Sequence, residues 1–211
     1  VVNRTQQHRE VIDAAKESAV KHIAYTSYER KNETGDVPVG PVAKSHLATE
    51  DFLKSSGIPY TILRNNLYTD FIPVYIGTRV LETGIFFPAG SGRFAPATRN
   101  DMAEAAAIVM IQEGHEKRTY GISGTENISF NDVAAILSKL SRIPVSYTSP
   151  DTETYKGSLM KTGVPDEYAN VFASFAVTIK AGEFEARHTD LDRLPRRKPT
   201  TVAEHFEQVY L

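Results

Sequence analysis

The sequence predicts an α/β fold in which helices cover a parallel β-sheet. Residues 10–19 carry apolar side chains at helical spacing, and residues 22–26 form a short apolar run that is typical of a buried strand. The same order then repeats, with a second helical pattern at residues 44–56 and a second apolar run at residues 58–64. Two helix–strand units in a row predict parallel strands that are covered by helices.

Local signals define the limits of these first elements. Gly57 takes the position that commonly ends a helix, and Pro59 stands at the start of the second strand, where a missing N–H is tolerated. Residues 29–41, between the two units, are polar and contain glycine and proline. This stretch predicts a long loop, and long loops often carry function.

The second half of the chain combines short strands with capped helices. A helix is expected over residues 69–83, and short strands over residues 85–87 and 93–95, around a turn at residues 90–92. Capping-box pairs predict three later helix starts: Thr98 with Asp101, Ser129 with Asp132, and Thr201 with Glu204. The remaining expected elements are strands at 119–123 and 145–147 and a mostly helical segment at 152–182.

Composition and charge exclude several classes of function. The 211 residues are 41% hydrophobic with a net charge of −2, so we expect a globular protein without a nucleic-acid partner. The absence of cysteine excludes disulfides and thiolate chemistry, and the six histidines form no metal-binding pair such as H-E-x-x-H. No apolar run reaches the roughly 18 residues that span a bilayer. We therefore expect a cytoplasmic protein without a metal site or a membrane partner.

Three stretches of the chain resemble the NmrA-like family of atypical short-chain dehydrogenases: residues 20–27, residues 46–50 with 57–68, and residues 88–92 with 98–101. Their order and spacing are similar to those of bacterial NAD(P)H:quinone oxidoreductases and triphenylmethane dye reductases. The resemblance extends over nearly the whole chain.

This resemblance implies a Rossmann-like, doubly wound parallel sheet with a smaller mixed α/β lobe toward the C-terminus. We assign residues 1–83 and 98–124 to the NAD(P)-binding domain, and residues 84–97 and 125–211 to a substrate-binding lobe. Family members carry a G-x-x-G-x-x-G turn near their N-terminus, which lets the cofactor pyrophosphate approach a helix. The chain contains no such turn. We therefore expect the first strands of the sheet to belong to a missing segment.

A second glycine motif in the chain is misleading. Gly90-Ser91-Gly92-Arg93-Phe94-Ala95 matches G-x-G-x-x-A, but a dinucleotide-binding motif must open a helix directly after a strand. Pro96 interrupts this stretch, and the next helix is expected only near Asp101. We predict a turn between short strands.

The Tyr-x-x-x-Lys pair of ordinary short-chain dehydrogenases is absent. The resemblance places its tyrosine at Val42 and its lysine at His46. Carbonyl reduction and sugar epimerisation need that tyrosine to move a proton, so both are disfavoured. Quinones and cationic triarylmethane dyes accept hydride directly. For them the protein must stack the nicotinamide against the acceptor and exclude water.

The resemblance therefore implies an NADPH- or NADH-dependent reductase of quinones or similar electron-poor aromatic compounds. The stretch at residues 64–71, which is similar to the dye and quinone reductases, favours this function. A nucleotide-sensing regulator of the NmrA kind, without turnover, is the alternative. A fragment that binds no nucleotide is a third interpretation, and the sequence leaves a homodimer open.

His46 and Tyr68 are the catalytic candidates. The resemblance implies that His46 contacts the cofactor ribose or nicotinamide, or relays a proton near neutral pH. The alternative for His46 is a helix-face histidine that bonds to a carbonyl. Lys44 is a rival, but it lies on another face of the same helix.

Polar residues follow the two predicted strands at their carboxyl ends, where ligands of α/β sheets bind. Thr26 and Ser27 end the first strand, and Asn65 and Asn66 end the second. With His46 they are the candidate cofactor-binding residues. The alternative is that these hydroxyls and amides only stabilise turns.

Two sets of aromatic residues recur at helical spacing: Tyr68, Phe71 and Tyr75, and later Phe172 and Phe175. They predict either a flat apolar pocket for an aromatic acceptor or an ordinary hydrophobic core. Tyr28 begins the long loop and is expected to cover the site. The candidate substrate-binding residues are thus Tyr28, Tyr68, Phe71 and Phe172.

Overall fold

The computed structural model describes residues 3–210, and its main sheet is parallel, as predicted. Three strands lie side by side in the order β1 (Ile23–Tyr28), β2 (Tyr60–Asn65) and β4 (Arg118–Ile122). Tyr28 at the end of β1 is opposite Asn65 at the end of β2, and Asn65 is opposite Ile122 of β4. The carboxyl ends of the strands therefore meet at one edge of the sheet.

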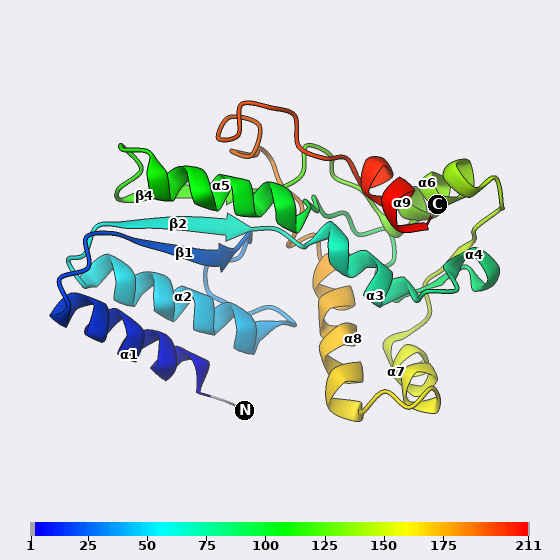
Figure 1. The fold of residues 1–211 in the computed structure, drawn as a ribbon. Coiled ribbons are helices and arrows are strands. Elements are labelled where there is room, and N and C mark those ends of the chain that lie inside the picture. Colours follow the sequence, from blue (N-terminus) through cyan, green and yellow to red (C-terminus); the bar gives the residue numbers. More distant parts are fainter. Residues whose placement is uncertain (1–2, 211) are drawn as a thin grey trace.

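Helices cover both faces of this sheet (Figure 1). α1 (Arg4–Glu17) and α2 (Gly40–Ser55) pack together on one face, and α5 (Arg99–Ile111) covers the other. Adjacent side chains of β2 point to opposite faces, so Ile62 packs against α1 and α2 while Leu63 packs against α5. Both are almost fully buried, which explains why this strand is a continuous apolar run.

The remaining elements surround a second hydrophobic core beside the sheet (Figure 1). They are η1 (Thr69–Phe71), α3 (Ile72–Ile76), α4 (Val80–Thr83), β3 (Ile85–Phe86), α6 (Phe130–Ser141), β5 (Tyr147–Thr148), α7 (Thr152–Lys161), α8 (Asp166–Lys180) and α9 (Val202–Tyr210). β3 and β5 pair in parallel. The core is rich in buried aromatic rings, among them Phe87, Phe94 and Phe130. Within residues 3–210, no helix is both long and apolar enough to cross a membrane.

The structure differs from the sequence prediction at two segments of this second core. The helix expected over residues 69–83 consists of three short pieces, because Gly77 ends α3 with a φ of 81°, which side-chain-bearing residues rarely adopt. The strand expected over residues 93–95 is a single bridge between Phe94 and Ile128.

Several element boundaries also differ from the prediction; α2, for example, begins at Gly40 and not at residue 44, with Pro41 in its first turn. α1 begins at Arg4 and not at residue 10, because the side chain of Asn3 accepts a hydrogen bond from the Gln6 N–H and caps the helix. β5 begins only at Tyr147, because the Val145 N–H bonds to a serine side chain of α6 and not to a strand.

The three predicted capping pairs all form. The hydroxyl of each Ser or Thr accepts a hydrogen bond from the backbone N–H three residues later: Thr98 from Asp101 at 3.1 Å, Ser129 from Asp132 at 3.3 Å and Thr201 from Glu204 at 3.2 Å. Each pair provides a hydrogen-bond acceptor for a backbone N–H in the first turn of the helix, which has no partner within the helix. Local sequence signals therefore determined these helix starts correctly.

The stretch from Gly90 to Gly92 forms a turn, as predicted, and does not open a helix. The Gly92 N–H bonds to the Ala89 carbonyl at 3.0 Å. Gly92 lies directly against the C-terminal end of α8, where an added Cβ would stand 2.2 Å from the Ile179 carbonyl oxygen. Glycine is thus required here by close packing on α8 and not by a phosphate group.

This packing predicts that Gly92→Ala destabilises the protein by about 1–3 kcal/mol, because the backbone of α8 must move. The matched control is Gly157→Ala in α7, where nothing lies within 4 Å of an added Cβ. Because alanine favours the helix more than glycine does, Gly157→Ala is expected to increase the free energy of unfolding by about 0.5–1 kcal/mol. Urea unfolding measures both, and equal stability of the two variants would contradict the close approach at Gly92.

Candidate functional site

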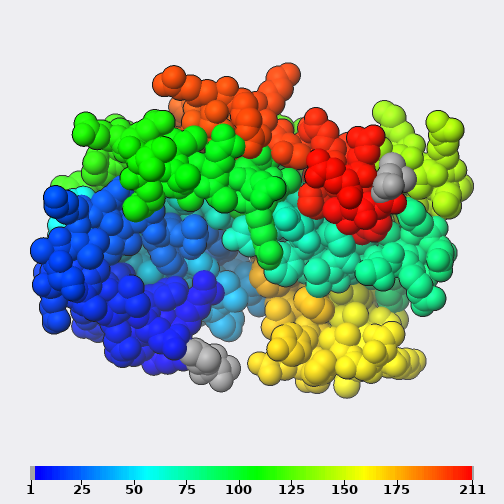
Figure 2. All heavy atoms as spheres, viewed as in Figure 1, coloured from blue at the N-terminus to red at the C-terminus, as the bar shows by residue number. Residues whose placement is uncertain are grey.

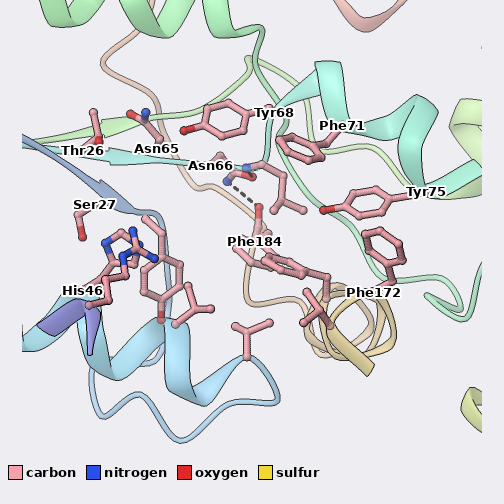
Figure 3. Close-up of a pocket in the computed structure, with 17 residues that line it drawn as sticks. Thr26, Ser27, His46, Asn65, Asn66, Tyr68, Phe71, Tyr75, Phe172 and Phe184 are labelled. Atoms are coloured by element: carbon pink, nitrogen blue, oxygen red, sulfur yellow. Dashed lines mark hydrogen bonds between the residues drawn. The ribbon is translucent and has the colours of Figure 1, made fainter. Parts of the chain in front are cut away.

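A cavity of about 340 Å³ opens at the carboxyl ends of β1 and β2, where ligands of parallel α/β sheets bind. Its walls come from the sheet and α2 on one side, and from α8 and the segment after β2 on the other (Figure 3). In Figure 2 the surface is indented between the blue residues of α1 and the yellow residues of α7 and α8. The nine residues selected from the sequence all line this cavity: Thr26, Ser27, Tyr28, His46, Asn65, Asn66, Tyr68, Phe71 and Phe172.

Polar and aromatic side chains occupy different ends of the cavity (Figure 3). The polar end is formed by Thr26, Ser27, His46 and Asn65, and the aromatic end by Tyr68, Phe71, Tyr75 and Phe172. This division suits one ligand group that hydrogen-bonds and one that is flat and apolar.

His46 lies on the cavity face of α2 and is held at both ring nitrogens. Nη2 of Arg4 lies 3.3 Å from its Nε2, and the hydroxyl oxygen of Tyr25 lies 2.7 Å from its Nδ1. A guanidinium carries only donors, so Nε2 accepts, and the proton of the neutral ring stands on Nδ1 and is donated to Tyr25. The structure therefore presents a neutral imidazole of defined tautomer to the cavity.

The surroundings of His46 keep it neutral. Burial, supported by the positive charge of Arg4, lowers the pKa of His46 to about 4. An imidazolium is therefore scarce at neutral pH, which favours the contact role over a proton relay. The rival Lys44 is exposed and pairs with Asp36 at 3.2 Å, outside the cavity.

Ser27 belongs to a buried ion network, called here the Glu50 network, with Arg30, Glu50 and Arg64. The Ser27 hydroxyl donates to Oε1 of Glu50 at 2.6 Å. Arg30 donates to both carboxylate oxygens at 2.8 and 3.0 Å, and Arg64 donates to Oε2 at 2.8 Å. Because its proton is used in this way, the oxygen of Ser27 can only accept a hydrogen bond from a cavity ligand.

Glu50 remains ionised although its side chain is only 1% exposed. Burial alone would raise the pKa of Glu50, but the hydrogen bonds from Arg30, Arg64 and Ser27 outweigh it and hold the pKa far below its ordinary value. No pattern in the sequence pointed to a role for Glu50. Arg64 gave a signal, as a charged residue in an apolar strand, whereas Arg30 on the loop gave none.

The two adjacent asparagines differ in what they leave free. Nδ2 of Asn66 donates to the Phe184 carbonyl at 2.9 Å and to Ser123 at 3.3 Å, and its Oδ1 accepts from the Leu67 N–H at 2.8 Å. Asn66 therefore fixes the segment around Phe184 under the cavity (Figure 3). In contrast, Oδ1 of Asn65 is buried without a hydrogen-bond partner among residues 3–210.

The aromatic end is a continuous set of ring contacts. The Phe71 ring lies 6.0 Å from Tyr68 and 6.4 Å from Tyr75, and Tyr75 meets Phe172 edge-on at 6.1 Å. Tyr75 also stacks on Phe87 of the second core at 5.2 Å, which holds this wall in place. The Tyr68 hydroxyl points toward the polar end (Figure 3). The two interpretations of these aromatics thus both apply, since the rings join the core and line the cavity.

Tyr28 is part of the wall of the cavity and not of a covering loop. It is the last residue of β1, and its ring lies 5.4 Å from His46 and 6.4 Å from Phe184. Burial raises the pKa of Tyr28 to about 12, so its hydroxyl stays protonated. The sequence named Tyr75 among the aromatics of a possible pocket, and it does line the cavity, but it missed Arg4, which reaches the cavity only through the packing of α1 on α2.

Known proteins share this fold and this arrangement of elements. The NmrA-like family model matches residues 1–206. Quinone oxidoreductase 2 of Escherichia coli is 37% identical over 214 residues, which cover 100% of this chain and 72% of that protein. The structure of the NADPH-dependent quinone oxidoreductase of Escherichia coli complexed with NADPH has a TM-score of 0.91 and 34% identity, over 100% of this chain and 73% of that one. These matches confirm the predicted Rossmann-like α/β fold.

A second solved structure is similar to the same degree. The Citrobacter sp. triphenylmethane reductase complexed with NADP(H) has a TM-score of 0.89 and 38% identity, over 99% of this chain and 73% of that one. One relative is a quinone oxidoreductase and the other is a triphenylmethane reductase. Similarity to them therefore does not rank the two kinds of acceptor.

The Glu50 network predicts a large stability loss for Glu50→Gln. The variant removes the buried counter-charge of Arg30 and leaves only the half-exposed Glu33 as its partner, so we expect a loss of about 3 kcal/mol or more. The control is Glu33→Gln, which also removes a partner of Arg30 but whose side chain is 56% exposed, with an expected loss below about 1 kcal/mol. Denaturant unfolding at neutral pH measures both. Equal losses would contradict a dominant role of the buried carboxylate.

The same network predicts acid sensitivity. Because the folded pKa of Glu50 is depressed, its stabilisation is fully present above the ordinary carboxyl value of 4.5 and declines as the pH falls below it. In Glu50→Gln this contribution to the pH dependence should be missing. An unchanged acid profile in that variant would show that other groups control acid unfolding.

The lowered pKa of His46 predicts that its ring is not protonated in the folded protein at pH 6. Nuclear magnetic resonance titration of the His46 ring should give a midpoint near pH 4. Arg4→Gln should raise this midpoint without restoring the ordinary value of 6.5, because burial is the larger cause. A midpoint near 6.5 in the unmodified protein would instead favour a proton-relay role for His46.

Proposed function

The chain belongs to the NmrA-like family, and from this premise we propose that it is an NAD(P)H-dependent oxidoreductase that transfers hydride to a quinone or a similar electron-poor aromatic acceptor. The single observation that carries the proposal is the cavity with one polar and one aromatic end, where the parallel strands terminate. Its relatives over the same length are NADPH-dependent quinone and NADP(H)-binding dye reductases.

The polar end fits the nicotinamide part of the cofactor. Oδ1 of Asn65 is a buried acceptor without a partner among the described residues, as an N–H or O–H of a carboxamide or ribose requires. Thr26 and the oxygen of Ser27 line the same end, and Nε2 of His46 is a further acceptor, at present in contact with Arg4. We propose that these four side chains hold the cofactor, whereas Asn66, the fifth candidate, has its amide engaged by Phe184 and Leu67 and supports the cavity from below. NADPH or NADH supplies the hydride when bound.

The aromatic end fits a flat acceptor. Phe71, Tyr75 and Phe172 offer ring faces and edges that exclude water from the place where the acceptor stacks. Tyr68 is the candidate that donates a hydrogen bond to an acceptor oxygen, since its hydroxyl points toward the polar end (Figure 3). The proton that completes reduction of a quinone comes from solvent.

The residues of α2 that line the cavity favour direct hydride transfer over carbonyl chemistry that depends on a tyrosine. Val42 and His46 both line the cavity, one helical turn apart, at the positions that the resemblance assigns to the tyrosine and the lysine. Neither a valine nor a neutral histidine provides a phenol that gives up its proton to a carbonyl. An acceptor that takes hydride without such help is therefore the best substrate for this site.

We keep the predicted division of the chain as part of the proposal. Residues 1–83 and 98–124 contribute the cofactor side of the cavity together with Tyr68, Phe71 and Tyr75 of the acceptor side, and residues 84–97 and 125–211 add α8 with its Phe172 to the acceptor side. A cytoplasmic location and a homodimer stay predictions.

The test measures NADPH and NADH oxidation with a panel of quinones and aromatic dyes. Asn65→Leu removes the free acceptor, so the KM for NADPH should rise about tenfold, the equivalent of one lost hydrogen bond. The matched control Asn170→Leu lies on the exposed side of α8 and should keep the normal KM. Tight nucleotide binding without oxidation by any acceptor would point to a sensor and end the enzyme assignment.

A further inference from the structure

A guanidinium stands behind the rings of the aromatic end. The side chain of Arg99 lies 4.8 Å from the centre of the Phe71 ring and 5.2 Å from the centre of the Tyr68 ring. Arg99 itself does not line the cavity, whereas both rings do. The rings therefore separate this positive charge from whatever occupies the cavity.

The position of Arg99 in its helix is unfavourable without these rings. It is the first residue of α5, and the positive end of the helix dipole disfavours cations there. Asp70 accepts a hydrogen bond from the backbone N–H of Arg99, so this carboxylate is engaged with the helix start. The contacts with Tyr68 and Phe71 are the interactions that compensate the guanidinium in this position.

Among the described residues, the cavity wall contributes no carboxylate that could neutralise a cation. Its 17 lining residues include no aspartate or glutamate, and Arg4 is the residue among them that carries a permanent charge. The carboxylate nearest to the polar end, Glu50, is already shared by Arg30 and Arg64. Arg4 at the polar end and the exposed Arg99 behind the aromatic end are therefore the cations nearest to an acceptor, while the carboxylate of Asp70 beside Arg99 bonds to the start of α5.

A positive potential acts differently on the two kinds of acceptor. A neutral quinone that receives a hydride, with its electron pair, becomes a hydroquinone anion, which then takes a proton from solvent. The negative charge develops in the transition state and is stabilised by nearby cations. A triarylmethane dye cation receives the hydride at its central carbon and becomes neutral. Its ground state must enter the cavity with a positive charge, and cations repel it.

We propose that Arg99, acting through the rings of Tyr68 and Phe71, makes the aromatic end selective for neutral quinones over cationic dyes. Arg99 is thus a specificity-determining residue that does not touch the acceptor. Because a ring quadrupole attracts cations on both of its faces, Arg99 on the outer face weakens the attraction for a cation on the inner face. The inference rests on the proposed function and names the acceptor class of that same site.

The experiment compares two acceptors, the neutral quinone menadione and the cationic dye malachite green, in the unmodified protein and in three variants. Arg99→Gln removes the charge, Arg99→Lys keeps it, and Arg79→Gln removes an exposed arginine that does not line the cavity. We expect the unmodified protein to have the larger kcat/KM for menadione. Arg99→Gln should shift the ratio toward the dye by roughly two- to fivefold. Arg99→Lys and Arg79→Gln should keep the original ratio.

The equilibrium binding of malachite green separates this inference from the proposed function. Binding should tighten in Arg99→Gln by the same factor, and a sulfonated, anionic dye of the same shape should bind more weakly in that variant. A preference of the unmodified protein for the cationic dye, or equal changes for all ligands in Arg99→Gln, would overturn the selectivity. Absence of turnover with every acceptor would overturn the proposed function, while the binding ratios would still decide the role of Arg99.

Discussion

The buried carboxylate of Glu50 connects the elements that form the polar end of the cavity. It joins α2 to the end of β1 through Ser27, to the long loop through Arg30, and to the end of β2 through Arg64. A charge this deeply buried is tolerated only when its partners are fixed in place. The network therefore ties together α2, β1, the long loop and β2, which must stay in register if His46 and Asn65 are to face one cavity. Stability and site geometry depend on the same ion pairs.

The polar end and the aromatic end are built by different physical principles. At the polar end, hydrogen bonds decide what remains free. Asn66 uses its amide to hold the backbone near Phe184, whereas the oxygen of its neighbour Asn65 has no hydrogen-bond partner in the part of the chain that the structure describes. At the aromatic end, packing decides, because Tyr75 is both a wall of the cavity and a stacked partner of the core ring Phe87. A hydride transfer site needs this combination, in which directional contacts orient one ligand and flat apolar surfaces align the other.

The charges around the cavity come mainly from the arginines near its two ends. Arg4 lies at the polar end, Arg99 stands behind the aromatic rings, and Arg30 is neutralised by its buried partner. His46 adds no charge, because burial favours its neutral form. A site of this polarity favours a reaction that creates negative charge on a neutral acceptor. It is poorly suited to a reaction that consumes a positive charge, and the two solved relatives divide between these two chemistries.

The sequence by itself determined the parallel α/β architecture, the caps at Thr98, Ser129 and Thr201, and the nine side chains that meet in the cavity. These follow from local periodicity, from neighbouring residues and from the family resemblance, and the carboxyl ends of parallel strands necessarily share one edge. Only the tertiary structure decided which of these groups are free. Arg4 meets His46 across 42 positions of the chain, and Asn66 meets Phe184 across 118. Such pairs form through packing of distant elements, so no local pattern encodes whether a hydroxyl, an amide or an imidazole is still available to a ligand.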